Sequence, residues 1–78
     1  MAEVTVRLNG LLSGRNDKTY AISFDGNRER LESALHRLTF KIPEQSIAFF
    51  AINGTKVSKD SWVNDGDIID VFPVVAGG

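Results

Sequence analysis

Two adjacent glycines, Gly77 and Gly78, are the last residues of the sequence and the most suggestive of chemistry. Because glycine has no Cβ, such a peptide is thin and free in its backbone angles, so it can thread a narrow channel. It could thereby bring a terminal carboxylate into the active site of another protein. Adenylation by ATP would turn a carboxylate oxygen into a leaving group, after which a sulfur or nitrogen nucleophile could attack. The alternative interpretation is a frayed chain end without a role.

Other kinds of chemistry find little support in the composition. There is no cysteine, which excludes a disulfide framework, a zinc finger and a cysteine nucleophile. The one histidine, His36, has no relay partner, and the aspartates after residue 59 lack the spacing of a calcium loop. No serine lies in a nucleophile elbow, and 78 residues can hardly enclose an active site. We therefore expect no metal site, no bound cofactor and no catalytic activity of the chain by itself.

Length and charge restrict the classes of partner. A chain of 78 residues with 42% hydrophobic and 24% charged residues is typical of one small globular domain. The formal net charge of −1 argues against a nucleic-acid binder, whose affinity comes largely from neutralising phosphates. The start lacks a signal-peptide pattern, and no apolar run approaches the roughly 20 residues of a membrane helix. We expect a cytoplasmic protein without a membrane or nucleic-acid partner.

Alternating side chains predict an N-terminal β-hairpin. Apolar and polar residues alternate over residues 4–9 and again over residues 20–24, which is typical of strands with one buried face. The polar residues 14–17 between them read as a turn in a longish loop.

A helix is predicted next, between Asn27 and Pro43. Apolar residues recur at helical spacing, Asn27 is a candidate N-cap, and Pro43 forbids continuation beyond Ile42. The apolar face of this helix consists of Leu31, Ala34, Leu35 and Leu38.

Three further strands are predicted after the helix. They cover Ile47 to Ile52, a short return strand at Lys56-Val57, and Ile68 to Phe72, before Pro73 ends the pairing. Asn53-Gly54 and residues 65–67 supply the turns. The order β-β-α-β-(β)-β indicates an α+β domain in which a mixed sheet of four to five strands packs on one helix.

An apolar patch is predicted on the face of the sheet that the helix leaves uncovered. Placing Phe50 under the helix leaves Phe49 on the open face, and if Asp70 faces solvent then Ile68 and Phe72 share its side. The alternative is an ordinary scatter of surface hydrophobic residues. Residues 60–78 also carry four aspartates and no basic residue, so the partner that receives this end of the domain is expected to be basic.

These features together resemble a known family. The order of elements, the Asn53-Gly54 turn, the Asp65-Gly66-Asp67 turn and the ending Phe72-Pro73-Val74-Val75-Ala76-Gly77-Gly78 resemble the β-grasp sulfur carriers, a ubiquitin-like group. That group contains the small subunit of molybdopterin synthase and the sulfur carrier of thiamine biosynthesis. The resemblance implies a β-grasp domain over residues 1–73 and a flexible tail over residues 74–78.

The resemblance also implies a reaction cycle. An ATP-dependent adenylyltransferase of the ubiquitin-activating type adenylates the Gly78 carboxylate. A sulfur donor such as a cysteine desulfurase or a rhodanese then supplies the sulfur of a thiocarboxylate, and the tail gives up this sulfur inside a synthase, with Gly77 as the flexible lead-in. ATP is used by the activating partner and no cofactor is bound here. The expected partner-contacting residues are Phe49, Ile68, Phe72, Pro73 and Val75.

The residues at the start of the tail indicate a branch of the family. Phe72-Pro73 and the long first hairpin resemble the molybdopterin-synthase small subunit, so the expected synthase partner is the large subunit of that enzyme. Carriers for thiamine, amino-acid or tRNA thiolation remain alternatives. So does a ubiquitin-like modifier that is conjugated through Gly78, and so does a plain β-grasp interaction module whose glycines are incidental.

Overall fold

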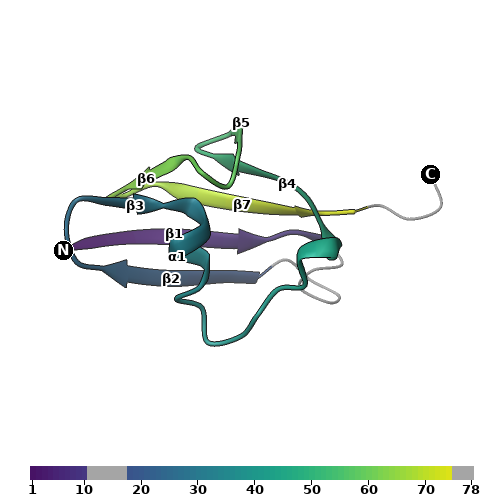
Figure 1. Ribbon diagram of the computed structural model, residues 1–78, viewed down its shortest axis with the longest axis horizontal. Helices are drawn as coiled ribbons and strands as arrows, with labels where there is room; N and C mark the ends of the chain where they lie inside the picture. Colours follow the sequence, from purple (N-terminus) through teal and green to yellow (C-terminus); the bar gives the residue numbers. More distant parts are fainter. Residues whose placement is uncertain (11–17, 75–78) are drawn as a thin grey trace.

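The computed structural model describes residues 1–10 and 18–74, which form a mixed sheet packed against a short helix (Figure 1). The main sheet has five strands in the order β2-β1-β7-β4-β5, and β3 and β6 form a separate two-stranded sheet. The elements are β1 (Ala2–Leu8), β2 (Lys18–Phe24), β3 (Arg28–Arg30), α1 (Leu31–Leu35), the 3-10 helix η2 (Glu44–Ser46), β4 (Ile47–Ile52), β5 (Thr55–Val57), β6 (Trp62–Asn64) and β7 (Ile68–Pro73). This architecture confirms the predicted α+β, β-grasp fold.

The centre of the sheet is the parallel pair of β1 and β7. Val6 lies opposite Ile69 and Leu8 lies opposite Val71, so the last strand runs alongside the first. β2 pairs antiparallel with the outer side of β1, and β4 pairs antiparallel with the other side of β7. The first and last strands therefore tie the two hairpins into one sheet.

The hydrophobic core lies between this sheet and α1. The inward side chains of β1 alternate strictly with outward ones, as the sequence predicted, and Leu31 of α1 is fully buried against them. The buried cluster comprises Ala2, Val4, Val6, Leu8, Ile22, Phe24, Leu31, Val63, Ile69 and Val71. Among the described residues no helix covers the other face of the sheet, which we call the open face (Figure 1).

The strands and turns that local patterns predicted are present. The predicted strand Ile47–Ile52 has the bounds of β4, and the return strand forms as β5. Asn53 (φ 50°) and Gly54 (φ 85°) both adopt the left-handed backbone of a tight hairpin turn. The polar residues 14–17 lie outside the described residues.

The predicted helix from Asn27 towards Ile42 is wrong in its extent. The helix α1 contains only five residues, Leu31–Leu35, and its first amides are satisfied by another part of the chain: Leu31 N donates to Ser61 O (2.8 Å) and Glu32 N donates to Lys59 O (3.0 Å). At the other end, Leu38 N donates to Leu35 O (3.2 Å), a 3-10 type bond that tightens the last turn. Asn27 is therefore no N-cap of this helix.

Residues 28–30 form a strand because they pair with β6. Arg28 lies opposite Asn64 and Arg30 lies opposite Trp62 in an antiparallel pair. The helical apolar spacing begins at Leu31, so nothing apolar holds residues 28–30 in the helix. Their pairing with a segment more than 30 residues away supplies the backbone hydrogen bonds instead.

Candidate functional site

The end of β7 leaves the sheet between two fixed contacts. On one side Gly10 has φ +60°, and a Cβ there would lie 3.2 Å from Pro73 Cγ, so the close approach depends on glycine. On the other side Val74 N donates to Ser46 O (2.9 Å). Closer to the middle of β7, Asn9 N donates to Val71 O (3.1 Å). These contacts hold Pro73 and Val74 in place at the end of β7, a point that we call the chain exit.

An aromatic pair lies on the open face beside this exit. Phe49 of β4 stacks on Phe72 of β7, with ring centroids 4.5 Å apart and an interplanar angle of 18°. A register shift between Ile47 and Phe49 sets Phe49 opposite Phe72. The ammonium of Lys56 lies 5.4 Å from the Phe49 centroid, and Phe49 is 37% exposed. The pair is thus a partly exposed aromatic surface with a cation at its edge.

Asp70 does not face solvent, contrary to the sequence prediction. It does lie on the open face, but it is only 4% exposed because Arg7 covers it from the neighbouring strand. Arg7 Nε and Nη2 donate to the two Asp70 carboxylate oxygens at 2.7 Å each, and Asn9 Nδ2 donates to Oδ1 at 3.3 Å. The bidentate geometry, made by a half-exposed arginine, locks β1 to β7 directly before the exit.

This ion pair makes the stability of the fold sensitive to acid. Hydrogen bonds from Arg7 hold the pKa of Asp70 below its usual value of 3.8, and burial opposes them only in part. A carboxyl whose pKa is lowered on folding contributes stability above its unfolded pKa and loses it as the pH falls through the folded pKa. The contribution is therefore fully present at pH 7, begins to decline near the ordinary pKa of 3.8, and is lost only as the pH falls through the lower pKa of folded Asp70.

Replacing Asp70 by asparagine is expected to cost about 2 kcal/mol of unfolding free energy at pH 7, because Arg7 loses its charged partner. The difference between wild type and D70N should shrink as the pH is lowered below about 4. Urea unfolding followed by circular dichroism at pH 7 and pH 3 measures it. Asp60→Asn is the matched control, since that carboxylate makes no hydrogen bond in the described part of the chain. If D70N lowered the free energy of unfolding equally at pH 7 and pH 3, the stabilisation would not come from the ionised Asp70 carboxylate.

The predicted partner-contacting residues do not form one continuous patch. Phe49, Phe72 and Pro73 lie together at the exit. Ile68 is 37% exposed on the same face, but it lies four residues before Phe72, about 13 Å away along the strand, and the Arg7–Asp70 pair lies between them. The remaining predicted site residues, Val75, Gly77 and Gly78, lie outside the described residues.

Two of the four aspartates of residues 60–78, Asp65 and Asp67, hold the turn at the opposite end of the sheet. Asp65 Oδ1 accepts a hydrogen bond from Glu3 N (2.9 Å), and Asp67 accepts from Asn64 N (2.8 Å) and from Asn53 Nδ2 (2.9 Å). They lie where β7 begins, whereas residue 74 lies where it ends (Figure 1). Their negative charge is therefore not beside the chain exit.

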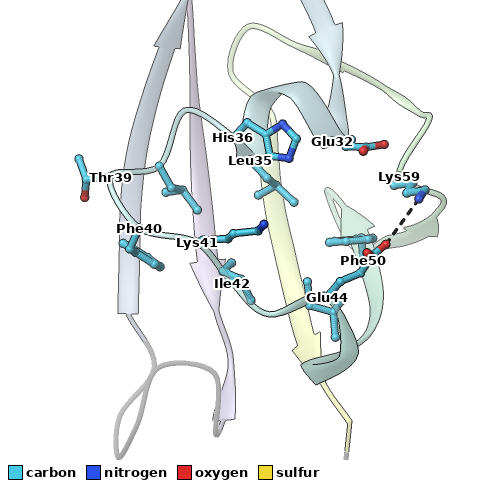
Figure 2. Close-up of a pocket in the computed structure, with 12 residues that line it drawn as sticks. Glu32, Leu35, His36, Thr39, Phe40, Lys41, Ile42, Glu44, Phe50 and Lys59 are labelled. Carbon is cyan, nitrogen blue, oxygen red and sulfur yellow. Dashed lines mark ion pairs between the residues drawn. The ribbon is translucent and has the colours of Figure 1, made fainter.

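A pocket of about 550 Å³ lies on the helix side of the sheet. Because α1 ends at Leu35, an irregular segment continues over the sheet, and Figure 2 shows Leu35, Ile42 and Phe50 around the hollow that remains. An ion pair between Lys59 and Glu44 (3.5 Å) crosses its edge. Phe50 and Phe49 point to opposite faces, so this pocket is separated from the aromatic pair by the sheet itself.

The described residues show neither a cluster of metal-ligating side chains nor a helix that could span a membrane. Across residues 1–10 and 18–74, no three His, Asp or Glu side chains gather in a way that could hold a metal ion. In the same part of the chain, no helix has the length and hydropathy needed to cross a membrane.

The comparisons with known proteins give one match. A scan against models of protein families matches residues 6–78 to the ThiS family. A search of curated proteins and a search of solved structures return no significant match. The matched segment runs from the middle of β1 to Gly78 and so includes the second half of β1, the later strands from β2 to β7 and the chain exit described above.

Proposed function

The chain belongs to the ThiS family of β-grasp sulfur carriers, and we propose that it carries sulfur as a thiocarboxylate on Gly78 for the synthesis of molybdopterin. Carriers of this family work with activating enzymes and with synthases. The observation that carries the proposal is the family match, which extends through Gly77 and Gly78. In this role the chain is a substrate and carrier, and the catalytic groups belong to its partners.

The proposed activation is an acyl substitution at the Gly78 carboxylate. Attack of this carboxylate on the α-phosphate of ATP gives the acyl adenylate and releases pyrophosphate. A sulfur nucleophile then attacks the acyl carbon, and AMP leaves with one of the former carboxylate oxygens. Since the chain has no cysteine, the sulfur comes from another molecule. Sulfide gives the thiocarboxylate directly. The persulfide of a cysteine desulfurase or a rhodanese first gives an acyl disulfide, which a second thiol of the donor protein then cleaves: that thiol forms a disulfide with the donor's sulfur and the thiocarboxylate is released.

The geometry at the end of β7 supports this role. The Gly10–Pro73 approach and the Val74–Ser46 hydrogen bond hold in place the two residues that precede the tail. The Phe49–Phe72 stack lies directly beside that point and offers the kind of aromatic surface that partner proteins use as an anchor. A partner that docks there would lie next to the segment that carries Gly78.

The molybdopterin branch is supported by the residues before the tail. Phe72-Pro73 ends β7, and the first hairpin has strands of seven residues. Both features resemble the small subunit of molybdopterin synthase, whose large subunit is then the expected acceptor of the tail. Copurification identifies the synthase, and with it the pathway.

Intact-mass spectrometry of the protein with an unmodified C-terminus tests the proposal. The protein is purified with its associated proteins. A second sample is incubated with ATP, sulfide and an adenylyltransferase that activates carriers of this family. We expect a mass increase equal to the replacement of one oxygen by sulfur, which fragmentation places on Gly78. A copurifying large subunit of molybdopterin synthase would support the branch, whereas a thiazole synthase would overturn it.

Two other results would overturn the carrier proposal. One is a terminus that stays unmodified after incubation with ATP, enzyme and sulfide. The other is a set of higher-mass conjugates that disappear when Gly78 is deleted, while no thiocarboxylate accumulates. The second result would make the chain a protein modifier joined through an isopeptide bond.

A further inference from the structure

The outer face of the two-stranded sheet carries an unusual set of side chains. Opposite residues of an antiparallel pair project to the same side, so Arg28 and Arg30 of β3 share a face with Asn64 and Trp62 of β6. Alternation turns the intervening Glu29 and Val63 to the other side, where Val63 is fully buried in the core. The outer face therefore presents two cations and one large aromatic ring, and no acidic residue.

Both arginines lie over the indole ring of Trp62. The guanidinium carbon of Arg28 lies 4.1 Å from the Trp62 ring centroid, and that of Arg30 lies 3.9 Å from it. Both guanidinium groups therefore contact the same indole ring. Trp62 nevertheless remains 41% exposed. We call Arg28, Trp62 and Arg30 the arginine–tryptophan surface.

Neither guanidinium is neutralised by a carboxylate. Within residues 1–10 and 18–74 no ion pair involves Arg28 or Arg30, and Arg30 donates only to the backbone carbonyl of Asp60, at 2.7 Å. The neighbouring Glu29 pairs instead with Arg37 on the other side of the strand, at 2.7 and 2.8 Å. Stacking on the indole holds both planar groups in place while most of their N–H donors stay available.

This surface lies far from the chain exit. β3 and β6 flank the end of the sheet at which β7 begins, and β7 then runs the length of the sheet to residue 74 (Figure 1). A protein bound at the arginine–tryptophan surface therefore leaves the Phe49–Phe72 stack and the exit accessible.

We propose that the arginine–tryptophan surface docks an acidic segment of a partner protein. Two preorganised guanidinium groups offer fork-shaped donor pairs that match carboxylates, and tryptophan and arginine are the residue types that dominate binding energy in protein interfaces. Nucleic acid fits less well, because two guanidinium groups already lie over the indole and compete with a base for stacking on it.

An acidic peptide of defined composition tests the proposal without any sulfur chemistry. Acetylated octaglutamate is titrated into the full chain, and binding is followed by calorimetry and by backbone amide shifts at low and high salt. We expect shifts centred on residues 28–30 and 60–64 and a clear weakening at high salt. The double variant R28Q/R30Q should bind at least about tenfold more weakly. The control K18Q/K41Q removes two positive charges elsewhere and should stay within about threefold of wild type.

Two further variants and probes complete the experiment. R28K/R30K keeps both charges but loses the planar forks, so it should bind more weakly than wild type even if R28Q/R30Q proves too unstable to study. The proposal is overturned if octaglutamate does not bind, or if K18Q/K41Q weakens binding as much as R28Q/R30Q. It is also overturned if lysine replaces arginine without loss, or if oligothymidylate of equal charge binds more tightly than octaglutamate.

Discussion

A chain that lacks Gly78 is expected to lose thiocarboxylate formation while keeping the stability of the wild type. Deletion moves the terminal acyl carbon back by one residue, about 3.5 Å. Reacting groups misplaced by as little as 1 Å can lose about a hundredfold in rate, so a shift of this size should reduce modification at least that far. All members of the buried cluster lie between Ala2 and Val71, so the free energy of unfolding should change by less than about 0.5 kcal/mol.

The measurement is the intact mass after incubation with ATP, the activating enzyme and sulfide, with thermal unfolding measured in parallel. Gly78→Ala is the matched control, because it retains a carboxylate at full length and adds only a methyl group. It should form thiocarboxylate more slowly than wild type but faster than the deletion variant. A deletion variant that is modified at the wild-type rate would refute the proposed role of Gly78.

A charge at Phe72 is expected to weaken the complex with the activating enzyme at least thirtyfold. Phe72 stacks on Phe49 beside the chain exit, and aspartate there would remove the aromatic contact and introduce a charge that must be desolvated on docking. Losing an aromatic anchor in the centre of an interface costs about 2 kcal/mol or more, which corresponds to this factor. Calorimetric titration of the activating enzyme with Phe72→Asp measures the effect.

Ile68→Asp separates a local contact from a general effect of charge on the open face. Ile68 belongs to the same strand and the same face, but the Arg7–Asp70 pair lies between it and Phe72. We expect the affinity to fall less than for Phe72→Asp, and circular dichroism must show both variants folded. Equal losses would make the whole open face the docking surface. An unchanged affinity for Phe72→Asp would remove the aromatic pair from the interface.

The parts of the fold that follow from local patterns could be predicted from the sequence. The alternation of Val4, Val6 and Leu8 has the period of a half-buried strand, and Asn53-Gly54 has the backbone freedom that a two-residue hairpin turn requires. Alternation also placed Phe49 and Phe72 on the open face. Each of these inferences depends only on neighbours in the sequence.

The features that depend on distant strands could not be predicted in this way. The burial of Asp70 follows from the parallel register that sets Arg7 beside it, 63 residues away. The shortened helix has the same kind of cause, because β6 captures residues 28–30 and nothing in the helical spacing reveals that pairing. The sequence does not show which residue an arginine on the polar side of a strand pairs with, because the pairing depends on the register of the neighbouring strand.

The role of Gly10 was missed for a similar reason. Its left-handed backbone and its approach to Pro73 depend on β1 and β7 lying side by side, and an isolated glycine after a strand reads only as a turn. Ser46 was missed because its contribution to the exit is a backbone carbonyl, which any residue could supply.

The parallel pairing of β1 with β7 also determines when the protein can fold during its synthesis. In the strand order β2-β1-β7-β4-β5, β7 is the strand that joins the β1–β2 hairpin to the β4–β5 hairpin. Without β7 the two hairpins are not connected, and neither has a complete core. Contacts between residues this far apart in the sequence form late and slowly. A nascent chain therefore stays unfolded until residues 68–73 have left the ribosome. Activating enzymes that recognise the folded sheet would consequently encounter only chains whose last strand is already complete.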